Sequence, residues 1–141
     1  MTPTLWGRLQ TRIILLLTVG LGWTIIVTPF LPSGGAPLGE VYRTTLSALA
    51  VVLVVGVIFW EPIYHGLQQL RWEKDWPTGI GLVTGISEGV STLVVLSVLR
   101  DVPTTAFWLH FLSTWFLVWI TLHGPLRIVA LRWRYRGGRF V

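Results

Sequence analysis

Apolar stretches long enough to cross a membrane alternate with short polar connections along the whole chain. They cover approximately residues 12–31, 44–65, 77–99 and 104–123. Because a hydrocarbon core about 30 Å thick is crossed by a helix of about 20 mainly apolar residues, each stretch predicts one membrane-spanning helix. The pattern therefore predicts an all-α, polytopic integral membrane protein: a four-transmembrane-helix bundle that forms one transmembrane domain over residues 1–141.

The basic residues are distributed unevenly between the connections. Of the 11 lysines and arginines, only Arg43 and Arg100 lie in the connections after the first and third spans. All the others precede the first span, separate the second from the third, or follow the fourth. Cytoplasmic loops of membrane proteins carry the excess of lysine and arginine. We therefore expect a cell-membrane protein with both termini in the cytoplasm (N-in/C-in).

Composition narrows the class of protein further. The chain is 52% hydrophobic and 12% charged, whereas soluble domains average about 25% charged residues. The net charge of +5 flanks the apolar spans, so anionic lipid headgroups explain it better than nucleic acid does. Cysteine is absent, which excludes disulfides, thiolate metal sites and cysteine nucleophiles.

Three glycines recur at every fourth position in the third span: Gly81, Gly85 and Gly89. At this spacing they lie on one face of a helix, and small residues allow a second helix to approach closely. The glycine face is therefore predicted to be a helix-packing surface, available to a second copy of the chain or to a partner protein.

Glu88 lies about 16 Å from either end of the third span, close to the glycine face. An ionisable residue at this depth costs about 2.5–3.5 kcal/mol, so it has either a functional or a specific packing role. Thr84 lies beside it. The fourth span places His110 within about one to two helical turns of the depth of Glu88, with Thr114 on the same helix face as His110. We expect these four residues to form an intramembrane polar site in which Glu88 pairs with His110.

A second polar group lies at the cytoplasmic boundary. Glu61 and His65 are four residues apart on the second span, and His123 ends the fourth; such side chains can bind a transition metal. The signal is weak, since Pro62 disturbs the spacing and polar residues are common at membrane boundaries. We predict no metal and no cofactor. The chain also lacks recognisable catalytic motifs, which favours a protein that is not an enzyme.

Two polar segments lie outside the spans. Residues 66–76 predict a short interfacial helix or a continuation of the second span, with Trp72 and Trp76 toward lipid, or else a surface for a partner. The basic tail over residues 126–141 places Trp133 and Tyr135 between its cations, which predicts that these aromatic side chains lie at the lipid interface. We expect the tail to bind anionic headgroups, at about 1 kcal/mol per cation; the alternatives are an acidic partner or a nucleic acid. Its cations are Arg127, Arg132, Arg134, Arg136 and Arg139.

These features favour a small non-enzymatic membrane protein that is a subunit or anchor of a membrane complex. It would associate with itself or with a larger partner through the glycine face. The alternative is a proton- or cation-coupled transporter or pore in which Glu88 carries the ion and His110 modulates it. A pore former of the phage type ranks third, and a metal- or haem-dependent enzyme ranks last.

Overall fold

The computed structural model describes residues 3–73 and 77–141, and every regular element in these ranges is a helix. Four helical segments in these ranges are long and apolar enough to cross a membrane, which agrees with the predicted all-α architecture of four spans. They are Leu5–Phe30, Leu38–Gln69, Ile80–Leu99 and Thr104–Val129, with 26, 32, 20 and 26 residues.

The first two spans are each interrupted by one wide π-helical turn. Span one consists of α1 (Leu5–Leu15), the π turn η1 (Leu16–Gly20), α2 (Leu21–Val27) and a final 3₁₀ turn, η2 (Thr28–Phe30). Span two consists of α3 (Leu38–Val55), the π turn η3 (Gly56–Trp60) and α4 (Glu61–Gln69).

The second half of the chain is a helical hairpin followed by two short helices. Its elements are α5 (Ile80–Leu99), α6 (Thr104–His123), α7 (Pro125–Val129) and α8 (Leu131–Tyr135). Gly124 leaves helical geometry, with φ −107° and ψ −98°, so α7 departs from the axis of α6. The predicted end of the fourth helix near residue 123 coincides with this break.

Span one begins earlier than the sequence pattern indicates, at Leu5 instead of near residue 12. Thr4 caps the helix because its hydroxyl accepts a hydrogen bond from the backbone N–H of Gly7 at 3.1 Å. Arg8 and Arg12 therefore lie within the first helix and not in front of it.

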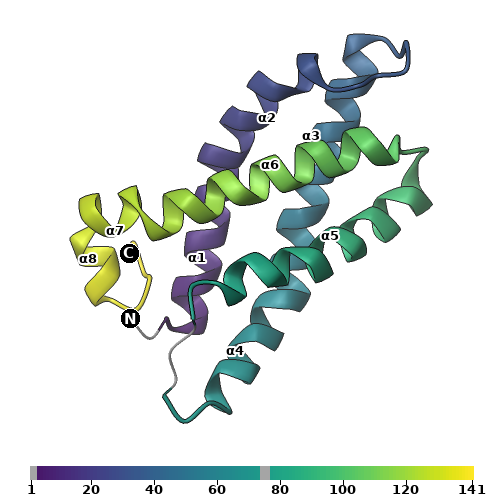
Figure 1. Ribbon diagram of the computed structural model, residues 1–141. Coiled ribbons are helices and arrows are strands. Elements are labelled where there is room, and N and C mark those ends of the chain that lie inside the picture. The colour runs from purple at the N-terminus through teal and green to yellow at the C-terminus, as the bar shows by residue number, and fades with distance from the viewer. Residues whose placement is uncertain (1–2, 74–76) are drawn as a thin grey trace.

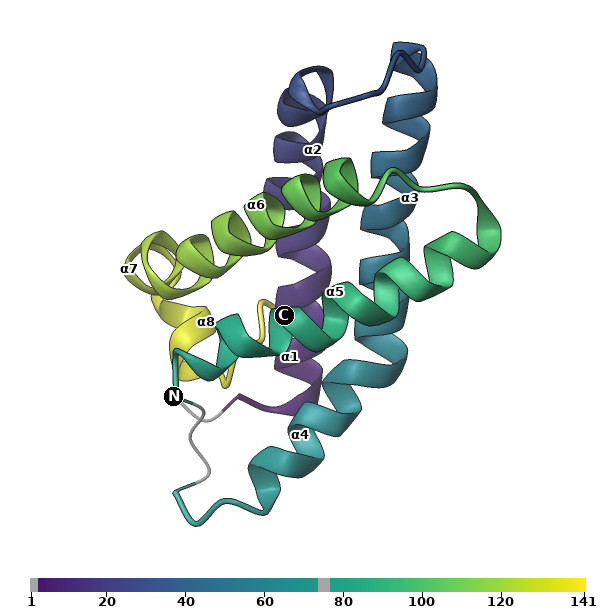
Figure 2. The same cartoon turned by 45° about the vertical axis from the view of Figure 1, so that its right-hand side comes forward.

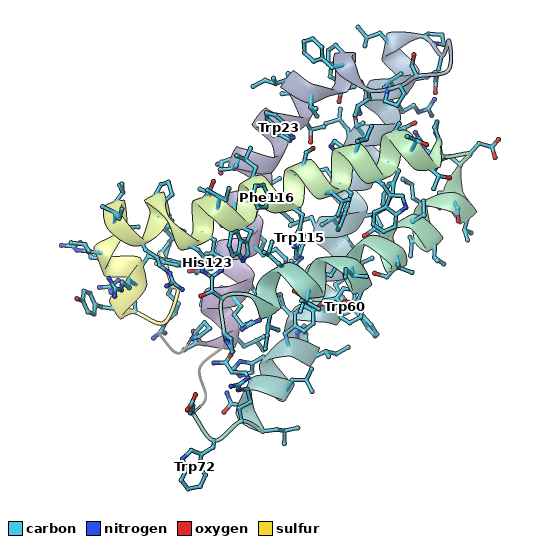
Figure 3. All side chains as sticks on the ribbon, in the orientation of Figure 1. Trp23, Trp60, Trp72, Trp115, Phe116 and His123 are labelled. Carbon is cyan, nitrogen blue, oxygen red and sulfur yellow. The ribbon has the colours of Figure 1, made fainter. Side chains whose placement is uncertain are left out.

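Span two also begins earlier, at Leu38, and continues to Gln69. Of the alternatives for residues 66–76, the continuation of the span therefore holds as far as Gln69. Trp72 is 98% exposed and projects from the end of α4 away from the bundle (Figure 3). The expectation for Trp76 falls on residues 74–76, which lie outside the described part of the chain.

Spans one and two lie side by side and antiparallel, and the hairpin of α5 and α6 crosses them obliquely (Figures 1 and 2). Indole–hydroxyl hydrogen bonds join the layers: Trp60 Nε1 donates to Ser91 Oγ at 3.0 Å, and Trp23 Nε1 donates to Ser113 Oγ at 2.9 Å. The two ends of the chain meet at one end of the bundle, where the Thr4 amide donates to the Gly137 carbonyl at 2.9 Å.

The core lies where the hairpin crosses the first two spans. Only 28% of the most apolar window of each span is buried within the chain, so most apolar side chains point outward, as they do toward lipid. The buried core cluster combines side chains from all four spans: Leu16, Ala48, Leu49, Val52, Leu96, Phe107 and Phe111.

The glycine face packs against α6 of the same chain. A Cβ atom at Gly85 would clash with the Trp115 indole, and one at Gly89 would lie 2.6 Å from Trp108. Trp115 Nε1 also donates to the Gly81 carbonyl at 3.1 Å. The glycines therefore act in helix packing, but within the chain, and contact with another protein has to use a different surface.

Candidate functional site

Arg12 lies at the centre of a buried group of charged side chains. Its Nη1 and Nη2 donate to the two carboxylate oxygens of Glu88 at 2.6 and 2.8 Å. Its Nε donates to Glu61 Oε1 at 2.7 Å. One guanidinium on α1 thus binds a carboxylate on α4 and another on α5, and it connects three of the four spans.

Arg8 extends this group by one helical turn along α1. Its Nε donates to Glu61 Oε2 at 2.8 Å, and its Nη1 donates to Gln68 Oε1 at 3.1 Å. Glu61 therefore accepts from both arginines, which lie on one face of α1 because they are four residues apart. We call Arg8, Arg12, Glu61 and Glu88 the ionic cluster; its two positive and two negative charges sum to zero.

The ionic cluster is almost completely withdrawn from the surface. The exposed fraction of the side chain is 2% for Glu88 and 9% for Arg12 and Glu61. A buried ion pair contributes little net stability when intact, but removal of one partner costs about 3–5 kcal/mol because the other charge is left uncompensated. The cluster therefore strongly favours a single arrangement of the helices that carry it.

The π turn η3 creates the space that Arg12 occupies. Gly56 is the first residue of this turn, and a Cβ atom there would overlap the Arg12 guanidinium. Glu61 follows directly after the turn, so the extra residue in the wide turn also sets the direction of its side chain. Single π turns are frequent at functional sites, and this one was not recognised in the sequence, where Gly56 is one glycine in a valine-rich span.

The predicted pairing of Glu88 with His110 is wrong. Glu88 binds Arg12, whereas His110 Nε2 lies 2.9 Å from Thr24 Oγ1 on α2. The physical reason is that a guanidinium binds a carboxylate through two charge-assisted hydrogen bonds, which a neutral imidazole cannot match. The sequence reasoning missed Arg12 as the partner because it placed the start of the first helix at that residue.

The two threonines of the predicted polar site bond to their own helices. Thr84 Oγ1 donates to the Gly81 carbonyl at 3.1 Å, and Thr114 Oγ1 donates to the His110 carbonyl at 2.7 Å. Thr114 is buried beside His110. The four predicted residues thus separate into two places, Glu88 with Thr84 on α5 and His110 with Thr114 on α6.

The three weak metal candidates are not brought together. Glu61 binds the two arginines, while His65 Nε2 lies 3.5 Å from the Gln69 amide nitrogen on the outside of α4. His123 lies at the end of α6. Among the residues that the structure describes, no three histidine, aspartate or glutamate side chains are grouped so that they could hold a metal ion.

A cavity of about 190 Å³ lies beside the ionic cluster, between α1, α4, the first turn of α5 and the last turns of α6. We call it the tail-side cavity, because Trp133 and Gly138 of the C-terminal tail complete its wall. Arg12, Glu61 and Trp115 all line it, and the Trp115 ring centroid lies 5.8 Å from the Arg12 guanidinium carbon.

Two polar groups at the junction of α6 and α7 lack a hydrogen-bond or ion-pair partner among the described residues. His123 lines the tail-side cavity, and its Nδ1 is buried without a hydrogen bond to any described residue. An unsatisfied buried group of this kind costs about 1–3 kcal/mol. Arg127 also lines the cavity, and no ion pair joins it to the described acidic residues. Figure 3 shows Trp115 and His123 on the side of α6 that faces α1 and α5.

The basic tail folds back onto α1. Trp133 is 2% exposed, and its Nε1 donates to Thr11 Oγ1 at 2.7 Å, which in turn donates to the Gly138 carbonyl at 2.9 Å. The expectation that Trp133 lies at the lipid interface is therefore wrong. Gly138 has φ +87°, a conformation suited to glycine. The arginines on either side of Trp133 point outward: Arg132, Arg134, Arg136 and Arg139 are exposed.

A second cavity, of about 160 Å³, lies at the opposite end of the bundle, where Glu40, Asp101 and His110 line it. The core separates it from the tail-side cavity. A third cavity, of only about 10 Å³, lies within this core and is lined mainly by apolar side chains that include Leu16 and Phe111. This volume is at the lower limit for one water molecule. The bundle is therefore closed at its centre.

No protein-family model, no curated protein and no solved structure matches this chain. The ionic cluster and the tail-side cavity are therefore the features from which a function has to be inferred.

Proposed function

We propose that this protein is a non-enzymatic, multi-pass protein of the cell membrane that acts as a subunit or anchor of a membrane complex. Its partner is either a second copy of the chain or a larger membrane protein. Both termini lie in the cytoplasm, because the exposed arginines of the tail gather where the chain ends meet.

The observation that carries this proposal is the neutral ionic cluster. Arg12 holds Glu61 and Glu88 at once, so spans one, two and three cannot move apart without exposing an uncompensated charge to a low-dielectric environment. A helix bundle held in this way presents a fixed outer surface. A fixed surface lowers the entropy cost of binding a partner, which suits an anchor.

The outward face of α5 is the partner surface that fits best, since α6 covers the glycine face. Six β-branched residues on this helix are exposed, and five of them recur at intervals of three or four residues. Branched side chains lose little rotamer freedom when they pack, and helix association in lipid depends on close packing. The five residues are Val83, Ile86, Val90, Val94 and Val98.

A specific observation also favours the alternative of a proton- or cation-coupled transporter. The tail-side cavity reaches Arg12 and Glu61, and Arg12 is bonded directly to Glu88. Transport through Glu88 would require the release of this carboxylate from Arg12 and the opening of the core around Leu16. The anchor ranks first because the cluster is neutral and the centre of the bundle is closed.

The test is native mass spectrometry of the tagged protein, purified from its own host in a mild detergent. The anchor proposal expects a homo-oligomer or a foreign membrane subunit at a fixed ratio. Two matched variants test the surface: Val90→Leu on the exposed face of α5 should weaken the complex, and Leu109→Ile on the exposed face of α6 should not. A monomer with only lipid attached would contradict the proposal.

A further inference from the structure

The tail-side cavity has walls of two chemical kinds. Trp115, Val118, Trp119 and Leu122 line it along α6 and form an apolar, largely aromatic wall. Its charged lining comes from Arg8, Arg12 and Glu61 on α1 and α4 and from Arg127 on α7, and the imidazole of His123 lies at the end of α6. A cavity with one apolar wall and with polar side chains elsewhere in its lining fits a molecule with an apolar chain and a polar head.

The cavity has an excess of positive charge at its α7 end. The charges of Arg8 and Arg12 are balanced by Glu61 and Glu88 within the ionic cluster. Arg127 has no acidic partner among the described residues. One cation thus remains for a ligand, and it lies four residues after His123, whose buried Nδ1 lacks a hydrogen bond to the described part of the chain.

The size of the cavity limits the apolar part of the ligand. Its volume is about 190 Å³, which equals the liquid volume of about six water molecules. Pockets for drug-sized ligands measure about 300–1,000 Å³. A two-chain phospholipid does not fit. The polar head of a single-chain amphiphile and the first carbon atoms of its chain do fit, with the rest of the chain outside the cavity.

We propose that the tail-side cavity is a binding site for a single-chain amphiphile that carries one anionic group. The anionic group, a carboxylate or a phosphate, binds at Arg127 and His123, and the chain lies against Trp115 and Trp119. A small inorganic anion would leave the aromatic wall uncovered, and an uncharged amphiphile would leave Arg127 without a counter-charge. The proposal does not depend on the role of the protein in a complex.

The experiment uses the full chain in phosphatidylcholine nanodiscs and a fatty acid with a photoreactive diazirine on its chain. After illumination, crosslinked peptides are mapped by mass spectrometry at increasing probe concentration. The expected result is saturable labelling of residues 115–123. An excess of oleate or of lysophosphatidate should displace the probe and reduce this labelling, and oleyl alcohol should not. If oleate competes more strongly, the preferred anionic group is a carboxylate; if lysophosphatidate does, it is a phosphate.

Two variants and a matched control test the site itself. Arg127→Gln should raise the probe concentration for half-maximal labelling at least tenfold, whereas Arg134→Gln, in the exposed part of α8, should leave it unchanged. Val118→Phe should fill the cavity and abolish saturable labelling while the protein remains folded by circular dichroism. Labelling spread evenly over the outward faces, equal displacement by oleyl alcohol, or normal labelling of a folded Val118→Phe variant would overturn the proposal.

Discussion

Arg12 and Glu88 are 76 residues apart in the chain, yet the guanidinium binds both carboxylate oxygens, at 2.6 and 2.8 Å. This contact joins the first span to the third inside the bundle, where charged side chains are almost never found unless they are paired. Because Glu61 binds the same guanidinium, the second span is held by the same residue. The arrangement of three helices thus depends on one arginine.

Loss of the Glu88 charge should destabilise the bundle. Glu88→Gln leaves the ionic cluster with a net charge of +1, since Glu61 alone then faces two arginines. We expect a loss of about 3 kcal/mol, the low end of the range for a broken buried pair, because Arg12 keeps one partner. Unfolding of the purified protein in detergent, followed by circular dichroism against denaturant, measures the change.

The matched control is Glu40→Gln. Glu40 also pairs with an arginine, Arg43, but the distance is 3.7 Å and the Glu40 side chain is 59% exposed. Exposed pairs contribute little, so this variant should differ from the wild type by no more than about 0.5 kcal/mol. Equal effects of the two substitutions would show that the burial of the Arg12–Glu88 pair does not matter.

A side chain at position 56 should displace the Arg12 guanidinium. Gly56→Ala places a methyl group where the guanidinium now lies, so Arg12 has to move away from Glu61 or Glu88. We expect destabilisation of about 2 kcal/mol or more, within the usual range for overpacking. Gly66→Ala is the control: it lies within α4 and meets open space, so it should stabilise the helix by about 0.5–1 kcal/mol.

The spans were predictable from the sequence because a run of about 20 mainly apolar residues has the length of a helix that crosses a hydrocarbon core. The start of the first helix was not predictable, because Arg8 and Arg12 resemble the cations that flank a span. Their burial depends on acceptors from two distant helices, Glu61 and Glu88. A single sequence does not reveal which of several cations a buried carboxylate will select.

The glycine face illustrates the same limit at another site. Its spacing correctly indicated close packing, since Gly85 and Gly89 leave the space that tryptophans of α6 occupy. Spacing alone could not tell whether the neighbouring helix belongs to the same chain. Likewise, Trp133 resembled an interfacial aromatic, and its burial depends on a hydrogen bond to Thr11, which is 122 residues away.

Because α6 packs closely against the glycine face, a larger side chain on that face of α5 should also destabilise α6. Gly85→Ala inserts a methyl group against Trp115, and the two helices then have to separate. We expect destabilisation of about 1–3 kcal/mol and increased hydrogen exchange in α6. Gly22→Ala is the control and should leave hydrogen exchange in α6 unchanged, because nothing lies within 4 Å of a Cβ atom there. Unchanged hydrogen exchange in the Gly85→Ala variant would argue against the close contact between α5 and α6.

The C-terminal tail should be released when its anchor is removed. Thr11→Val keeps the shape of the side chain but removes the acceptor for Trp133 and the donor for the Gly138 carbonyl. We expect faster trypsin cleavage between residues 132 and 139, by about fivefold for a loss of about 1 kcal/mol. Tyr135→Phe, at an exposed position of α8, should be cleaved at the wild-type rate.

The orientation in the membrane can be measured directly, because the chain contains no cysteine. Single cysteines at Ala36, in the connection after span one, and at Val141 should react differently with a membrane-impermeant maleimide. With both termini in the cytoplasm, Ala36→Cys reacts in intact cells and Val141→Cys reacts only after lysis. The opposite pattern would reverse the topology.

The central claim is that the ionic cluster holds the helices together and does not carry an ion. Proton flux into liposomes that contain the purified wild-type protein, under an imposed pH gradient and membrane potential, tests it most directly. We predict a flux equal to the leak of protein-free liposomes, for the wild type and for Glu88→Gln alike. A wild-type flux several times above the leak, abolished in a folded Glu88→Gln variant, would contradict this claim and establish Glu88 as the carrier.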